Sequence, residues 1–141
     1  MVSVAIQAPP ERLYFFLTDI ENLSDFFPGM EFRRETEGRL KAGDRYHTRR
    51  KGAKGWTAYR VLALEPNARM SAELAGRDWL FQALRYDHRF LPDGEQTISQ
   101  ERVDYTLRYG FFGRLLNRVI GRRLIGKQVL EAHLRLKEKA E

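Results

Sequence analysis

The sequence predicts an α+β fold in which a curved antiparallel sheet wraps around a long C-terminal helix, with two short helices after the first strand. Three observations lead to this prediction. Residues 2–7 alternate apolar and polar side chains, as a half-buried strand does. The same period of two recurs between turn-forming residues from 30 to 108, and residues 113–139 carry apolar side chains at helical spacing. The length of 141 residues suits a single domain over residues 1–141.

The composition narrows the chemistry that is available. With 43% hydrophobic and 31% charged residues, the chain is predicted to fold around one core. It has no cysteine, which excludes disulfides and thiolate chemistry, and its three histidines are expected to be too scattered for a zinc site. No metal and no cofactor are therefore expected. Without a long apolar run or a leader-like N-terminus, the sequence predicts a soluble, cytoplasmic protein.

Two short helices are expected after the first strand. Pro10 and Glu11 suit a first helical turn, and apolar residues follow at helical spacing, which predicts a helix over residues 10–20. A second helix is expected from residue 21 or 22 to about Phe27, because Pro28-Gly29 cannot continue it.

Residues 30–108 predict an antiparallel meander of six strands. Its clearest turn is Pro92-Asp93-Gly94, in which proline presets φ and glycine accepts a positive φ. This turn should join two long strands. Around residues 56–64 the two faces of the strand are about equally hydrophobic, so its inward face is left open, and a β-bulge would explain the ambiguity.

Alternation within the two long strands predicts which side chains face the core. In the first strand the even-numbered residues 84–90 should point inward. In the second, Val103, Tyr105 and Leu107 should share the inward face, and Asp104 should lie on the outer one. Something must cover this inward face, and the C-terminal helix is the available element.

That C-terminal helix has an irregular middle. Gly121 and Gly126 each weaken a helix by about 1 kcal/mol relative to alanine, so a bend or break is expected between residues 121 and 126. The helix carries an apolar stripe that is expected to face the core. The stripe consists of Phe112, Leu115, Leu116, Val119, Leu130 and Leu134.

Four stretches of the chain carry a recognisable set of motifs. Val4 to Leu13 reads as a strand followed by an "apolar-x-Ala-Pro-x-Glu-x-apolar" helix start, and residues 17–29 read as "Leu-x-Asp-x-x-Asn-Leu" and "aromatic-Pro-Gly". Val61 to Pro66 and Phe90 to Thr97 end strands in Glu-Pro and Pro-Asp-Gly turns. Together with the order of elements, they resemble the START-like or helix-grip superfamily, also called SRPBCC. The likeness is greatest to its polyketide cyclase/dehydrase-like branch and covers essentially the whole chain.

The resemblance implies a cavity between the sheet and the C-terminal helix that binds a lipid, polyketide or other aromatic ligand without a cofactor. Such a ligand is held by burial of its apolar body, at roughly 25 cal/mol per Å², and oriented by a few polar groups. We expect Tyr86, His88 and Tyr105 to supply these groups, with Tyr46 or Tyr59 as further candidates. The expected walls are Phe16, Phe27, Leu84, Phe90, Val103, Leu116 and Ile120.

An enzyme is the first alternative. An inward His88 beside Tyr86 would serve as a general acid or base in a cyclisation or dehydration near neutral pH. His47 and His133 lie among charged residues and are predicted to be solvated, so no second inward ionisable group is expected to support His88. Ligand binding is therefore the favoured interpretation.

A membrane-surface module is the second alternative. Residues 105–130 contain six basic residues and no acidic one. Arg114, Arg118 and Arg122 fall on one ridge of the helix, as in a basic amphipathic helix that lies on an anionic membrane. The ordinary alternative is a solvated face paired with acidic residues elsewhere. No nucleic-acid reader motif is present, so nucleic acid is not expected as a partner, and both a monomer and a homodimer remain open.

Overall fold

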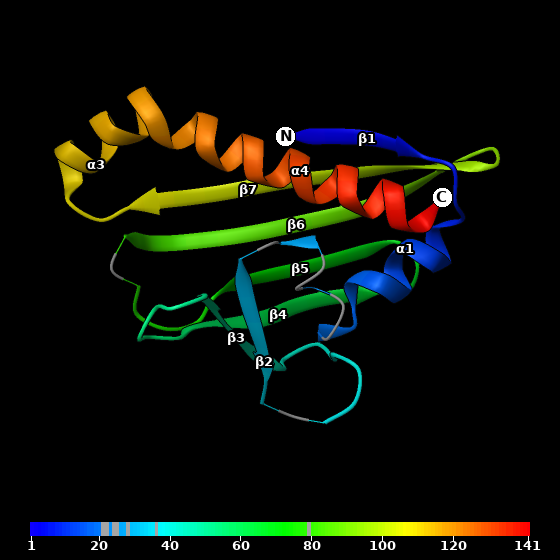
Figure 1. Cartoon of the computed structure of the whole chain (residues 1–141), viewed down its shortest axis with the longest axis horizontal. Helices are drawn as coiled ribbons and strands as arrows, with labels where there is room; N and C mark the ends of the chain where they lie inside the picture. The colour runs from blue at the N-terminus through cyan, green and yellow to red at the C-terminus, as the bar shows by residue number, and fades with distance from the viewer. Residues whose placement is uncertain (21–22, 24–25, 28, 36, 79) are drawn as a thin grey trace.

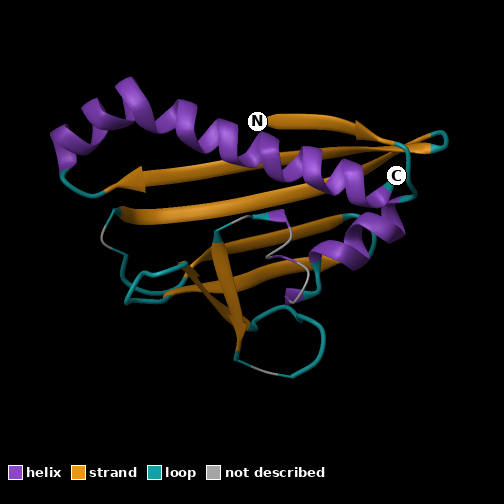
Figure 2. Ribbon diagram, in the orientation of Figure 1, coloured by secondary structure: helices purple, strands orange, loops and turns teal. Residues whose placement is uncertain are grey.

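The structure is a computed structural model that describes every residue except 21–22, 24–25, 28, 36 and 79. It contains a seven-stranded antiparallel sheet with the strand order β1-β7-β6-β5-β4-β3-β2. A helical segment runs along the strands at the β6–β7 side (Figures 1 and 2). The strands are β1 (Val2–Ile6), β2 (Met30–Arg34), β3 (Arg45–Arg50), β4 (Thr57–Glu65), β5 (Arg69–Leu74), β6 (Phe81–Asp93) and β7 (Gln96–Leu107). The helices are α1 (Pro10–Leu17), α3 (Gly110–Leu116), the π-helical η1 (Asn117–Gly121) and α4 (Arg122–Ala140).

The predicted meander is confirmed as strands β2 to β7. Its Pro92-Asp93-Gly94 turn joins the two long strands, with Asp93 opposite Gln96 and Gly94 at φ 63°. Helix α1 ends at Leu17, three residues before the predicted limit, because Thr18 closes it by donating its hydroxyl and its backbone N–H to the carbonyl of Tyr14. The second predicted helix falls largely on residues 21, 22, 24 and 25, which lie outside the described residues.

The ambiguous strand over residues 56–64 contains the expected β-bulge. The pairing of β4 with β5 shifts between Val61 and Ala63. Before the shift Tyr59 and Val61 belong to the core, and after it Leu64 does. The extra residue therefore changes the inward parity within one strand, which is why neither face of the strand is clearly more apolar in the sequence.

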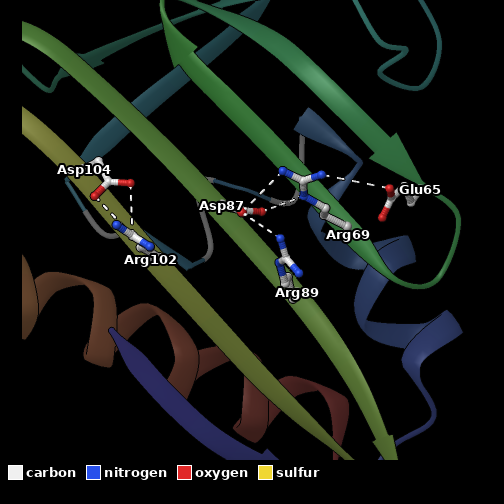
Figure 3. A network of polar contacts seen from close by, with 6 residues as sticks. All are labelled: Glu65, Arg69, Asp87, Arg89, Arg102 and Asp104. Carbon is white, nitrogen blue, oxygen red and sulfur yellow. Dashed lines mark hydrogen bonds and ion pairs between the residues drawn. The ribbon is translucent and has the colours of Figure 1, made fainter.

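The outer face of the sheet carries ion pairs, one between the neighbouring strands β5 and β6 and one within β7 (Figure 3). Arg69 Nε lies 2.8 Å from Asp87 Oδ1, and Arg102 Nε lies 3.2 Å from Asp104 Oδ2. The position of Asp104 on the outer face is thus confirmed. The exposed pair of Arg102 and Asp104 contributes at most about 1 kcal/mol, and the pair of Arg69 and Asp87 is partly buried. The outer faces of β6 and β7 are therefore charged, whereas their inner faces are mainly apolar.

The C-terminal helix does not bury the stripe that the sequence predicted. Apart from Val119, whose side chain lies outside the described part of the structure, the expected apolar residues are exposed, with 74% for Phe112, 46% for Leu116 and 48% for Leu134. The helix instead packs against the sheet through a smaller and partly polar set of residues. The buried set is Val129, Ala132, His133, Leu136 and Ala140.

The expected irregularity of this helix lies earlier than predicted. It is the π-helical turn η1, and α4 is regular from Arg122 onward, including Gly126. A π-turn inserts an extra residue, so the side chains before it point in directions that regular helical spacing does not predict. Among the described residues no helix combines the length and hydropathy needed to cross a bilayer.

Gly113 and Gly126 allow a matched test of how α3 packs. A Cβ atom on Gly113 would collide with the carbonyl oxygen of Arg108 and lie 3.1 Å from Cβ of Leu107, whereas a Cβ atom on Gly126 would meet nothing within 4 Å. We expect Gly113→Ala to lower the free energy of unfolding by about 2 kcal/mol, because the backbone must move. Gly126→Ala should raise it by about 1 kcal/mol through helix propensity. Urea unfolding followed by circular dichroism measures both; equal effects would contradict this packing of α3.

Candidate functional site

The inward residues of β6 and β7 form a ladder of cross-strand pairs on the face of the sheet beneath the helix. His88 lies opposite Glu101, and the pairs on either side bring further predicted site residues together. Leu84, His88 and Phe90 are buried, whereas the side chains of Tyr86, Val103 and Tyr105 are only partly buried. The flanking pairs are Leu84 with Tyr105, Tyr86 with Val103, and Phe90 with Ser99.

A chain of four polar side chains crosses from this ladder to α4. His88 Nε2 lies 2.7 Å from Ser99 Oγ, which lies 3.0 Å from His133 Nδ1. His133 Nε2 in turn lies 2.9 Å from Glu101 Oε2. All four residues are buried, and the two imidazole rings stack with centroids 4.5 Å apart. We call His88, Ser99, Glu101 and His133 the polar chain.

Three members of the polar chain, Ser99, Glu101 and His133, were not anticipated as site residues. The prediction that His133 is solvated is wrong, because its side chain is 1% exposed and faces the sheet. Glu101 was overlooked, although it shares strand parity with Val103 and Tyr105. Extending that parity toward the turn would have placed Glu101 inward. His47, also predicted to be solvated, is partly buried and contacts Glu35 Oε2 at 3.0 Å.

Burial and pairing set the protonation of the polar chain. Burial lowers the pKa of His88 to about 4, and the neighbouring His133 acts in the same direction against the attraction of Glu101. Burial alone would raise the pKa of Glu101, but the hydrogen bond from His133 and the two histidines hold it below its ordinary value. Glu101 is therefore an ionised acceptor, and His88 is neutral at physiological pH.

One arrangement of hydrogens satisfies every contact of the polar chain when both imidazoles are neutral. His133 Nε2–H donates to Glu101, and His133 Nδ1 accepts from the Ser99 hydroxyl. The Ser99 oxygen then accepts from His88 Nε2–H. This leaves the lone pair of His88 Nδ1, 4.0 Å from Glu101 Oε2, without a donor among the described residues. The polar chain thus connects a basic nitrogen to a buried carboxylate.

The same residues also form a candidate metal-ligand set, since ligand atoms of His88, Glu101 and His133 lie within 4.8 Å of one another. The expectation that the histidines are scattered is therefore wrong. However, the two rings are stacked with an interplanar angle of only 20°, so their lone pairs lie in two nearly parallel, separate planes and do not converge on one ion. The geometry suits hydrogen bonding better than metal coordination.

A row of three tyrosines continues the inward face toward β3. The Tyr46 and Tyr59 rings stack at 5.5 Å, and the Tyr59 and Tyr86 rings lie 6.0 Å apart, with a hydrogen bond between their side chains. Burial raises the pKa of all three phenols, that of Tyr59 to about 12. Their hydroxyls therefore stay protonated and are suited to donate hydrogen bonds to a ligand.

The remaining candidate wall residues divide into two groups. Phe16 and Phe27 pack against the core. Leu116 and Ile120 were expected to face inward, but they are 46% and 47% exposed because this part of the helix is rotated away from the sheet. Tyr105 contacts this part of the helix, donating its hydroxyl to Asn117 Oδ1.

Two surface hollows lie near this end of the sheet. One, of about 610 Å³, is lined by Arg77, Asp78, Arg108 and Tyr109. The other, of about 410 Å³, is lined mainly by outer-face residues of β6 and β7. The second hollow includes the predicted site residues Leu84 and Tyr105, but neither hollow is lined by Tyr86, His88 or Phe90.

Over residues 1–141 the chain matches the family described as polyketide cyclase/dehydrase and lipid transport. Its fold is similar to that of TTHA0849 from Thermus thermophilus, at 24% identity and a TM-score of 0.79 over 99% of this chain and 94% of that one. A START superfamily protein from Mycobacterium smegmatis matches at 16% identity and a TM-score of 0.75 over 99% and 97% of the two chains.

A third solved structure is the di-domain ARO/CYC StfQ from the steffimycin biosynthetic pathway. It matches at 14% identity and a TM-score of 0.75, over 99% of this chain and 49% of that one. No curated protein matches the sequence. At these identities the solved structures show the fold, and this fold is the helix-grip, START-like arrangement that the sequence predicted.

The polar chain makes stability depend on pH. Because the pKa of His88 falls from 6.5 in the unfolded chain to about 4 in the folded protein, only the unfolded chain takes up this proton between those values. The free energy of unfolding should fall across this window by up to about 3 kcal/mol as the pH is lowered. Glu101 acts in the same direction at lower pH, since its folded pKa is also depressed. Urea unfolding at several pH values measures the slope.

His88→Gln should flatten this slope more than the control His47→Gln does. His47 contacts a half-exposed glutamate outside the polar chain. An unaltered slope in His88→Gln would contradict a buried, neutral His88.

Proposed function

The chain belongs to the polyketide cyclase/dehydrase and lipid transport family, and from that membership we propose that it binds a hydrophobic small molecule non-covalently between the sheet and the C-terminal helix. Membership supports a START-like ligand-binding or polyketide cyclase/dehydrase domain. We further propose that the ligand is a lipid, a polyketide or an aromatic compound, and that it contacts the inward-facing residues of the sheet.

The main support is the mixed chemistry of the partly buried inward residues. Tyr86 lies opposite the apolar Val103 and next to the fully buried polar chain, and the Tyr59 ring lies 6.0 Å from that of Tyr86. An apolar body would lie against Val103 and Leu84, while a hydroxyl or carbonyl group of the ligand would accept a hydrogen bond from Tyr59, whose oxygen accepts from Tyr86. This arrangement suits an apolar ligand with one polar end.

We place the entrance at the η1 end of the inward face. There the helix contacts the sheet through the hydrogen bond from Tyr105 to Asn117, whereas α4 further along is anchored by buried side chains. Breaking this one partly buried hydrogen bond costs less than moving a buried, paired carboxylate. Opening at Tyr105 would therefore admit a ligand without disturbing the polar chain.

Filling the inward face should abolish binding. We expect Val103→Trp to prevent binding of the apolar probe anilinonaphthalene sulfonate, because the indole would occupy the space beside Tyr86. Thr106→Trp, which adds the same side chain at an exposed position on the same strand, is the control. Fluorescence titration measures binding, and thermal unfolding checks that both variants fold. Equal binding by folded Val103→Trp and wild-type protein would overturn the proposal.

Native mass spectrometry of the purified protein, repeated after organic extraction, tests the natural ligand class. A stoichiometric apolar compound that is lost from Val103→Trp but retained by Thr106→Trp would support the proposal. A compound retained equally by both variants would place it elsewhere on the chain.

A second candidate function, acid–base catalysis, is favoured by the polar chain. A proton taken from a ligand by His88 Nδ1 would be balanced by transfer of Nε2–H to Ser99, of the serine proton to His133, and of Nε2–H to Glu101. The base thus has the ionisable support that the sequence pattern did not predict. Its partner is the polar chain and not Tyr86, whose hydroxyl pairs with Tyr59.

Catalysis can be tested on a β-hydroxy ketone, whose dehydration begins with loss of a carbon-bound proton to His88 Nδ1 and ends when the hydroxyl takes that proton back from His88 and leaves as water. We expect His88→Gln to reduce formation of the unsaturated ketone by about a hundredfold or more, and Glu101→Gln to reduce it less. Product is followed by mass spectrometry as loss of one water. His47→Gln is the control, and product formation that survives His88→Gln would rule out this role for His88.

A further inference from the structure

The outer side of the C-terminal helix is unusually apolar where it begins. Phe111 and Phe112 are 73% and 74% exposed and form an edge-to-face pair with ring centroids 6.1 Å apart. Isolated apolar residues on a surface are ordinary, but a contiguous set of large ones marks an interaction site. The set continues along α3, η1 and the start of α4 with Leu115, Leu116, Ile120 and Leu124.

The same segment is strongly basic. Arg114, Arg118 and Arg122 are exposed, and no ion pair joins any of them to an acidic residue in the part of the chain that the structure describes. This differs from the outer face of the sheet, where Arg69, Arg89 and Arg102 are paired with aspartates (Figure 3). The described residues therefore do not form the alternative arrangement, in which the arginine ridge is solvated and paired with acidic residues. Arg123 and Lys127 add two more exposed cations, and residues 105–130 contain no acidic residue.

A hollow beside the start of α3 adds an independent observation. Arg77, Asp78, Arg108 and Tyr109 line a space of about 610 Å³ there. The Nε atom of Arg108 is buried and has no hydrogen-bond partner among the described residues. The hollow places the exposed Arg77 beside Arg108, with Asp78 as the acidic member of the lining. A phosphate group at the edge of a lipid layer would meet Arg77 at this position.

We propose that Phe111 to Lys127 form a docking face for a bilayer that contains anionic lipids. In this arrangement the helix lies in the plane of the bilayer surface, with the phenylalanines and leucines inserted among the acyl chains and the arginines at the phosphates. Figure 1 shows α3 at one end of the molecule, beyond the end of β7, where a flat surface can reach it. The docking face is separate from the polar chain and does not depend on the identity of the internal ligand.

A second copy of the chain fits this face less well than a lipid surface. In a two-fold symmetric contact the same patch meets itself, so Arg114, Arg118 and Arg122 would face one another. Juxtaposed like charges are unfavourable, whereas an anionic bilayer offers both opposite charge and an apolar interior. Charge complementarity thus selects the bilayer.

Vesicle co-sedimentation tests the docking face. The full chain should bind vesicles of phosphatidylcholine mixed with phosphatidylglycerol, and bind phosphatidylcholine alone far less, with added salt weakening the binding. Arg114→Glu with Arg118→Glu should weaken binding about thirtyfold or more. Phe111→Ser with Phe112→Ser should weaken it about tenfold or more, because insertion is lost while the charge is unchanged.

The matched control is Lys51→Glu with Lys54→Glu, which makes the same change in net charge in the exposed turn between β3 and β4. We expect it to retain most of the vesicle binding. If this control weakens vesicle binding as much as the arginine substitutions do, binding depends on net charge alone and the proposal is overturned. Vesicle binding that survives the phenylalanine substitutions would also overturn the proposal. A third contrary result would be a wild-type protein that does not bind vesicles but forms a dimer in light scattering, with the dimer abolished by the phenylalanine substitutions. Circular dichroism verifies that each variant is folded.

Discussion

The contact of His133 with Glu101 and Ser99 determines how the C-terminal helix lies on the sheet. A buried carboxylate is tolerated only when it is paired, and Glu101 is paired by an imidazole that comes from α4. Rotating or sliding the helix by one residue would remove His133 from this position and leave Glu101 buried and unpaired. The cost of several kcal/mol makes other positions of the helix unfavourable.

This constraint divides the helix into two parts with different roles. Around His133 the helix is fixed by Leu136 and Ala140, which are 1% exposed and pack in the core. Before Arg122 the chain passes through the π-turn, and its large apolar residues face outward. One helix therefore closes the inward face of the sheet at one end and presents an unpartnered apolar and basic surface at the other. The proposed ligand site and the proposed docking face meet at η1, where Tyr105 contacts Asn117.

Prediction from the sequence succeeded where the pattern was local. The parity of β6 placed His88 and Phe90 inward, and the Pro92-Asp93-Gly94 turn set the register of the long hairpin. Prediction failed at Glu101, because a carboxylate is normally assigned to a solvated face, although its parity with Val103 indicated otherwise. For His133 the helical pattern was misleading. The most apolar stripe of the helix contains the leucines, and it was therefore expected to be buried. The side that is buried contains valine, alanine, histidine and only one leucine.

The sequence by itself determined the strands, their turns, the two faces of the sheet and the run of cations without acids. These features depend on residues within a few positions of one another, so periodicity and turn chemistry suffice to specify them. Only the tertiary structure decided the rotation of the C-terminal helix, and with it the polar chain and the exposure of Phe111 and Phe112. The reason is that the deciding contacts join His133 to Glu101 and Ser99, which are 32 and 34 residues away, and the free energy of pairing a buried charge outweighs the local preference to bury leucine.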